Sequence, residues 1–171
     1  MKKVMVFGKP GSGKSTLSKR LANKLGLPLH QIDLMAYQPN GLAVGRSQFE
    51  QVHSRLLCSE SWICDGLGPI SAFNQRLELA DTLIYIDLPY SISYWLVTKR
   101  LFKSIYKKPE GWPEGCSVLK GTIESYKFLR RSRAFWNDDF FNALQQKGQG
   151  KSIYRVKSLT ELSELEHTLK Q

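Results

Sequence analysis

The chain has 171 residues, of which 42% are hydrophobic and 23% are charged, and we expect residues 1–171 to form one globular domain around one core. No apolar run approaches the ~20 residues that a membrane-spanning helix needs. The apolar stretch after the first lysines is too short for a signal peptide, and the three cysteines have no paired spacing. The composition therefore argues against a membrane protein, a secreted disulfide scaffold and a zinc site, and it predicts a cytoplasmic protein.

The net charge is +10, and much of it lies in one segment. Residues 99–133 hold ten basic and three acidic side chains, a net charge of +7. A local excess of this size is typical of a nucleic-acid-binding patch or of a clamp for polyphosphates. The charge pattern alone leaves both interpretations open.

The predicted elements alternate between strands and helices. In chain order, the pattern predicts a strand at 4–7, a helix at 14–25, a strand at 28–32, a helix at 46–59, strands at 61–66 and 81–89, a helix at 91–106, a loop at 107–116, helices at 122–131 and 135–146, a strand at 151–156 and a helix at 159–169. On the helix at 46–59 we expect Phe49, Val52 and Leu56 to face the core. Such alternation predicts an α/β fold with a parallel sheet and right-handed crossovers.

The first predicted strand runs into a complete phosphate-binding loop. Residues 8–15 match the pattern G-x-x-x-x-G-K-[ST] between a strand and a helix, which is the context that the motif requires. Its glycines let successive backbone N–H groups point at a phosphate, and Lys14 opens the helix whose dipole attracts the same charge. Ser15 supplies a hydroxyl ligand for Mg²⁺. We therefore expect ATP and Mg²⁺, with the nucleotide bound by Gly8, Pro10, Gly11, Ser12, Gly13, Lys14, Ser15 and Thr16.

Three aspartates follow predicted strands, so we expect them at the sheet edge that carries the phosphate loop. Any one of them is readily explained as a turn or cap residue, but three together argue for a metal ion and an acceptor hydroxyl. Asp65, after the apolar residues 62–64, best fits the role of holding Mg²⁺ through water. Asp33 is the candidate for orienting the acceptor, and Asp87 is interpreted as structural.

These motifs together resemble a known family. The phosphate loop, "HQID" (30–33), "WICDG" (62–66), "NQRLELADTLIYIDLP" (74–89) and "RRSR" (130–133) are similar to the adenylate-kinase-related group called DNA topology modulation proteins (FlaR-like). The resemblance covers nearly the whole chain. It implies the P-loop NTPase fold of nucleoside-monophosphate kinases, which is a five-stranded parallel sheet of order 2-3-1-4-5 with a small mobile lid.

The resemblance also implies roles for several basic residues. Arg76 matches an arginine on the acceptor side, with a solvated helix residue as the alternative. The residues that resemble lid and catalytic arginines are Arg100, Arg130, Arg131 and Arg133. The loop at 107–116 corresponds to a short lid, in which Trp112 either stacks on a base or anchors the loop. The chain departs from the family pattern at Leu67-Gly68, where Asn-Tyr is usual, and in the lysines of the lid loop.

The predicted function is the transfer of the ATP γ-phosphate to a small acceptor such as a nucleoside or a nucleoside monophosphate. Phosphoryl transfer depends on positioning and positive charge rather than on a covalent nucleophile, and the assigned residues supply both. We assign catalytic roles to Lys14, Asp33, Asp65, Arg76, Arg100, Arg131 and Arg133, and metal binding to Ser15 and Asp65. The histidines at 30, 53 and 167 are interpreted as structural or surface residues. Two alternatives stay open: a nucleotide-binding regulator that contacts DNA through the basic segment, and a small-metabolite kinase of the sugar-acid or shikimate type.

Overall fold

The computed structural model describes residues 1–38, 42–107, 109 and 112–169, without the side chain of Glu166. Its centre is one sheet of five parallel strands in the order β2-β3-β1-β4-β5. The strands are β1 (Lys3–Gly8), β2 (Leu29–Gln31), β3 (Trp62–Asp65), β4 (Thr82–Ile86) and β5 (Ser152–Val156). The predicted fold and strand order are thus confirmed.

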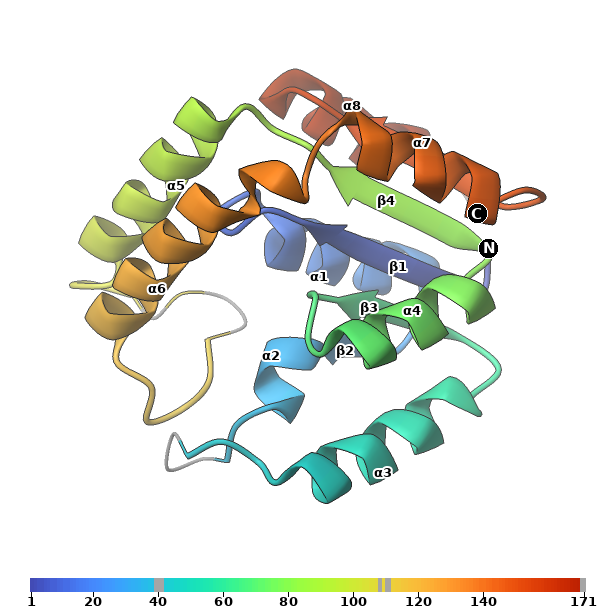
Figure 1. Cartoon of the computed structure of the whole chain (residues 1–171), viewed down its shortest axis with the longest axis horizontal. Helices are drawn as coiled ribbons and strands as arrows, with labels where there is room; N and C mark the ends of the chain where they lie inside the picture. Colours follow the sequence, from blue (N-terminus) through green and yellow to red (C-terminus); the bar gives the residue numbers. More distant parts are fainter. Residues whose placement is uncertain (39–41, 108, 110–111, 170–171) are drawn as a thin grey trace.

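Helices cover both faces of the sheet. They are α1 (Lys14–Leu25), α2 (Ile32–Met35), α3 (Arg46–Leu57), α4 (Ile70–Leu79), α5 (Tyr90–Lys103), α6 (Val118–Arg131), the 3₁₀ helix η1 (Ser132–Ala134), α7 (Asp138–Lys147) and α8 (Leu159–Thr168). In Figure 1, α1 lies behind the sheet, α4 and α7 lie in front of it, and α5 packs against α6 to one side. Within the described residues no helix is long and apolar enough to cross a membrane.

The central strand β1 divides the core into two halves. Val4 and Val6 pack with Leu21 of α1 on one face, whereas Met5 and Phe7 pack on the other face. The second half is rich in aromatic side chains from α4, β4 and α7, and it includes the buried Trp136. Burial on both faces explains why β1 is a continuous apolar run rather than an alternating one. Because β1 ends at Gly8, where the phosphate loop begins, the strand places this loop at the carboxyl edge of the sheet.

The element predictions failed at particular residues. The short helix α2 and the crossover helix α4 were not among the predicted elements. On α3, Val52 was predicted to face the core but is 43% exposed. His53, the next residue, is buried there instead, with 2% exposure. The helix α7 begins at Asp138 rather than at Phe135, because the side chain of Asn137 caps it by accepting a hydrogen bond from the N–H of Phe140 at 2.8 Å.

Candidate active site

The phosphate loop leaves β1 through a turn that only glycine fits. Gly8 has a φ of +145°, and a Cβ there would lie 2.2 Å from the carbonyl oxygen of Ile86 in β4. A Cβ on Gly11 would lie 2.6 Å from a methyl group of Val97 in α5. These approaches bring the loop against β4 and α5, which fixes where a bound phosphate chain would lie.

Lys14, the first residue of α1, folds back over this loop. Its ammonium Nζ donates a hydrogen bond of 2.9 Å to the backbone carbonyl of Lys9. Burial lowers the pKa of Lys14, while the carboxylates of Asp65 and Asp33 oppose that decrease. Lys14 is therefore a partly desolvated cation at the mouth of the loop, with two carboxylates close enough to act on it.

Asp65 is the last residue of β3 and is 4% exposed. Burial raises the pKa of Asp65, and the Lys14 ammonium and a hydrogen bond from Ser15 oppose the increase. Its oxygen Oδ1 is buried without a hydrogen-bond partner in the described part of the chain. A hydroxyl and a carboxylate are hard oxygen donors, and the unpartnered carboxylate oxygen is an acceptor that a metal-bound water would satisfy. Ser15 and Asp65 thus fit a Mg²⁺ ion.

Asp33 and Arg100 complete the group around Lys14. Asp33 lies in the first turn of α2, where it is exposed, two residues after the end of β2. Its charge acts on both Lys14 and Arg100. Arg100, near the end of α5, donates from Nη2 to the hydroxyl of Ser125 at 3.0 Å. The structure therefore brings together four predicted site residues from four elements, Lys14, Asp33, Asp65 and Arg100.

Trp112 anchors the predicted lid loop to α6. The Arg100 guanidinium lies over its ring at 4.9 Å, and its indole N–H donates to the carbonyl of Cys116 at 3.0 Å. A Cβ on Gly121 would overlap the ring, so the absence of a side chain there admits the indole. Of the two interpretations of Trp112, the structure favours the anchor. The rest of the lid prediction includes Lys108, Glu110 and Gly111, which lie outside the described residues.

Arg76 is fully buried in α4, so the alternative of a solvated helix residue is wrong. Its Nη2 donates to the carbonyls of Leu67 at 2.5 Å and Gly66 at 3.4 Å. Its Nη1 lies 3.2 Å from Nε2 of His53, which has a structural role as predicted. Arg76 thus holds the loop that follows Asp65, and the acceptor contact implied by the family resemblance stays a prediction.

Arg131 and Arg133 of the "RRSR" segment have other surroundings in the structure. Arg131 is exposed and lines an apolar cavity of about 310 Å³ between α4 and the end of α6, together with Leu67, Ile70, Phe128, Ser132 and Phe135. The Arg133 guanidinium lies over the ring of Tyr90 at 5.3 Å. Within the described residues, neither arginine makes a hydrogen bond, ion pair or ring contact with Lys14 or Asp65. Their assignment as catalytic residues stays a prediction.

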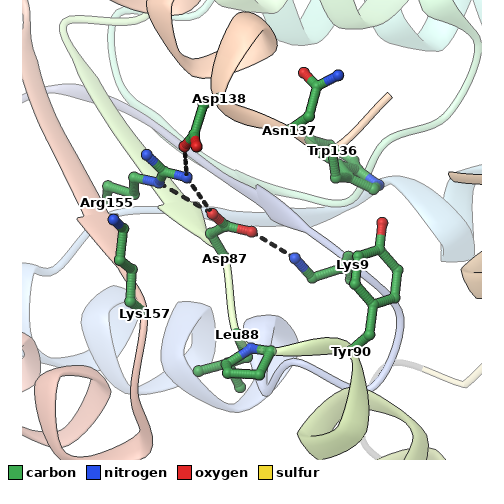
Figure 2. Close-up of a pocket in the computed structure, with 10 residues that line it drawn as sticks. Lys9, Asp87, Leu88, Tyr90, Trp136, Asn137, Asp138, Arg155 and Lys157 are labelled. Carbon is green, nitrogen blue, oxygen red and sulfur yellow. Dashed lines mark hydrogen bonds and ion pairs between the residues drawn. The ribbon is translucent and has the colours of Figure 1, made fainter. Parts of the chain in front are cut away.

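A second cavity, of about 350 Å³, lies on the carboxyl edge of β4 and β5 (Figure 2). Its walls carry an ion-pair chain that sequence reasoning did not find, formed by Lys9, Asp87, Arg155 and Asp138. Lys9 occupies an unspecified position of the phosphate-loop pattern, so the motif gave no signal for it. The sequence did offer one signal for this chain of ion pairs, because Asp87 directly follows a buried strand. Asp87 was interpreted as structural, and no partner was assigned to it.

Comparison with known proteins agrees with this architecture. The family model "ATPase family associated with various cellular activities (AAA)" matches residues 4–63, from β1 into β3. The shikimate kinase of Mycobacterium tuberculosis (strain ATCC 25177 / H37Ra) is 28% identical over 99 residues, which are 50% of this chain and 56% of that protein. The chain thus spans little more than half the length of these mycobacterial relatives.

A longer match reaches the shikimate kinase of Persephonella marina, which is 25% identical over 91% of this chain and 94% of that protein. Among solved structures, shikimate kinase from Acinetobacter baumannii in complex with shikimate matches with a TM-score of 0.58 and 12% identity. That match covers 99% of this chain and 90% of the other. Sheet order, phosphate loop and structural similarity agree that the chain has the fold of P-loop kinases.

Proposed function

We propose that the protein is an ATP-dependent kinase that transfers the γ-phosphoryl group of ATP to a small acceptor. One observation carries the proposal: Lys14, Ser15 and Asp65 meet at the mouth of the phosphate loop, with Asp33 and Arg100 close enough to act on the same charges. Phosphoryl transfer requires a cradle for the phosphates, a metal site, positive charge and a group that orients the acceptor. Each requirement has a named residue here.

The roles follow from the geometry. Lys14 exchanges its bond to the Lys9 carbonyl for the β- and γ-phosphate oxygens, and the loop amides hold the phosphate chain. Ser15 and Asp65 hold Mg²⁺, which when bound neutralises phosphate charge. Asp33, exposed beside Arg100, accepts a hydrogen bond from the acceptor and orients its attacking oxygen.

Two acceptor classes are each favoured by one observation. The named activity of the relatives favours a small hydroxylated acid such as shikimate. The apolar cavity beside Leu67, which Phe128 and Phe135 also line, instead favours an acceptor with a flat apolar face, such as a nucleoside or a nucleoside monophosphate. Arg131, at the wall of that cavity, would pair with the phosphate of a monophosphate.

A second candidate function is a nucleotide-binding regulator of the DNA topology modulation group. The family resemblance supports it, as does the exposure of many basic side chains in residues 99–133, among them Lys99, Lys103, Arg130, Arg131 and Arg133. A regulator of this kind would bind ATP through the same loop and DNA through the basic segment. ATP turnover on an acceptor separates the two candidates.

The test is ADP release from ATP and Mg²⁺ with shikimate, sugar acids, nucleosides and nucleoside monophosphates, each measured against ATP alone. We expect one acceptor class to raise ADP release above the background, and Lys14→Ala to remove that increase. The matched control is Lys147→Ala, which changes an exposed lysine at the end of α7. The kinase proposal would be rejected if Lys14→Ala turned over ATP as the parent does. It would also be rejected if the parent bound DNA selectively and showed no acceptor-dependent turnover.

A further inference from the structure

Lys9 is held through both its backbone and its side chain. Its carbonyl accepts hydrogen bonds from Lys14 Nζ at 2.9 Å and from the N–H of Ser12 at 3.4 Å. Its side chain is 2% exposed and contacts Asp87, outside the loop. The phosphate-loop pattern accepts any residue at this position, so the burial of a lysine here is a feature of this chain.

The buried ammonium of Lys9 begins a chain of alternating charges. Its Nζ donates to Oδ1 of Asp87 at 2.5 Å. The other carboxylate oxygen of Asp87 accepts from Nε and Nη2 of Arg155 at 3.0 and 2.7 Å, and Nη2 also donates to Asp138 at 2.6 Å. Figure 2 shows Arg155 between the two aspartates. The chain thus joins the phosphate loop to the first residue of α7 through the ends of β4 and β5.

A second path joins Lys9 to the arginine segment. Its Nζ lies 4.7 Å from the centre of the Tyr90 ring, and the Arg133 guanidinium lies 5.3 Å from the centre of the same ring. Because Arg133 and Asp138 lie only five positions apart, both paths end in the segment 133–138, which begins at the last "RRSR" residue. The first path consists of hydrogen-bonded ion pairs and the second of two charge–ring contacts, so a movement of Lys9 would act on both ends of this segment.

We propose that Lys9 is a positioning residue that couples the state of the phosphate loop to the position of the segment 130–138. The proposal rests on the proposed binding of ATP by this loop. When the phosphates draw Lys14 away, the Lys9 carbonyl loses its shorter hydrogen bond and retains the longer one from Ser12, so its peptide unit is held less firmly and can reorient. Its side chain passes that change to Asp87 and Tyr90, and thereby to the arginines that would act on the transferred phosphoryl group.

The test is hydrogen exchange of the segment 130–138, with and without ATP and Mg²⁺, in the parent protein and in Lys9→Met. In the parent, ATP is expected to slow exchange in this segment. Lys9→Met is expected to retain ATP binding, measured by calorimetry, because Lys14, Ser15 and the loop amides are intact. It is also expected to lose the ATP-dependent slowing of exchange in this segment. A merely structural lysine would alter stability and leave that change in place. Lys147→Met, at an exposed site, is expected to respond as the parent does.

A second variant covers the case in which Lys9→Met does not fold. Lys9→Met/Asp87→Asn removes both charges of the buried pair, so that neither is stranded, and Arg155 retains Asp138. It is expected to show the same loss of the ATP-dependent change. The proposal is overturned if ATP slows exchange in the folded variant as it does in the parent, or if bound ATP does not change exchange of this segment in the parent. Neither result contradicts the kinase function. A parent that does not bind ATP fails the proposed function itself and the coupling with it.

Discussion

Nη1 of Arg76 contacts Nε2 of His53 at 3.2 Å, joining α4 to α3 inside the core. Because a guanidinium only donates, the facing imidazole nitrogen must accept, and His53 is neutral. Burial, together with the positive charge of Arg76, lowers the pKa of His53 to about 4. The pair supports the loop 66–67 directly after the proposed metal ligand Asp65.

This depressed pKa predicts a loss of stability in acid. Between pH ~6.5 and about 4, His53 takes up a proton in the unfolded chain but not in the folded one, so the free energy of unfolding falls as pH falls. His53→Gln removes that titration and should reduce the loss by about 1–3 kcal/mol. Urea denaturation at pH 7.5 and 4.5 measures the difference between the two proteins. Equal acid losses would exclude His53 as the cause.

Replacing Arg76 should damage both stability and the site. Arg76→Met leaves the carbonyls of Gly66 and Leu67 without their donor, at a cost of about 2–4 kcal/mol. Urea denaturation gives this cost, and the Mg²⁺ dependence of ADP release reports whether Asp65 has shifted. The control is Arg46→Met, because the pair of Arg46 with Glu50 is exposed and screened by solvent, so its loss should change stability little. Similar losses in the two variants would contradict the assigned role of Arg76.

The same residues show how far sequence reasoning reaches. The strand at Val4–Phe7 and the helix Lys14–Leu25 were predicted well because a continuous apolar run and a glycine motif fix local structure. Val52 was preferred to His53 for the core because periodicity weighs only hydrophobicity. A buried histidine becomes favourable when a buried arginine needs an acceptor, and that arginine lies 23 positions along the chain.

The site shows the same limit. Lys14, Asp33 and Asp65 were predicted because strand ends and a phosphate loop share one edge of a parallel sheet. Besides His53, the partners of Arg76 are backbone carbonyls of a loop, which no side-chain pattern reveals. Lys9 was missed because its partner Asp87 becomes a neighbour only when β4 pairs with β1.

Asp65 and Asp33 should have separable roles. Asp65→Asn removes a buried carboxylate from the proposed metal site, so turnover should require more Mg²⁺ whichever acceptor is used. Asp33→Asn should raise KM for the acceptor or lower kcat, with ATP affinity little changed. Calorimetry with ATP and a Mg²⁺ titration of ADP release distinguish them. Identical effects of the two substitutions on ATP affinity would rule out this division.

The arginine segment separates the kinase from a DNA-binding regulator. If Arg131 or Arg133 contacts the transferred phosphoryl group, replacement by alanine should lower kcat, by ~10³-fold for an arginine-finger contact, with ATP affinity changed far less. The control is Lys103→Ala, an exposed site in the last turn of α5.

A DNA-binding patch predicts a different result for the same variants. Each lost phosphate contact should reduce the slope of log affinity against log salt concentration by about one. We expect turnover to fall and DNA binding to stay weak and non-specific. Selective DNA binding that the variants lose, with parent turnover unchanged, would favour the regulator.

The central claim is that the loop at residues 8–16 binds ATP through Lys14, and calorimetry of Lys14→Ala with ATP and Mg²⁺ tests it most directly. The circular dichroism spectrum shows whether the variant is folded, and Lys147→Ala is the control for the loss of a lysine. We predict that the parent and the control bind ATP, whereas folded Lys14→Ala shows no measurable binding. Equal ATP affinity in the parent and in Lys14→Ala would contradict the account.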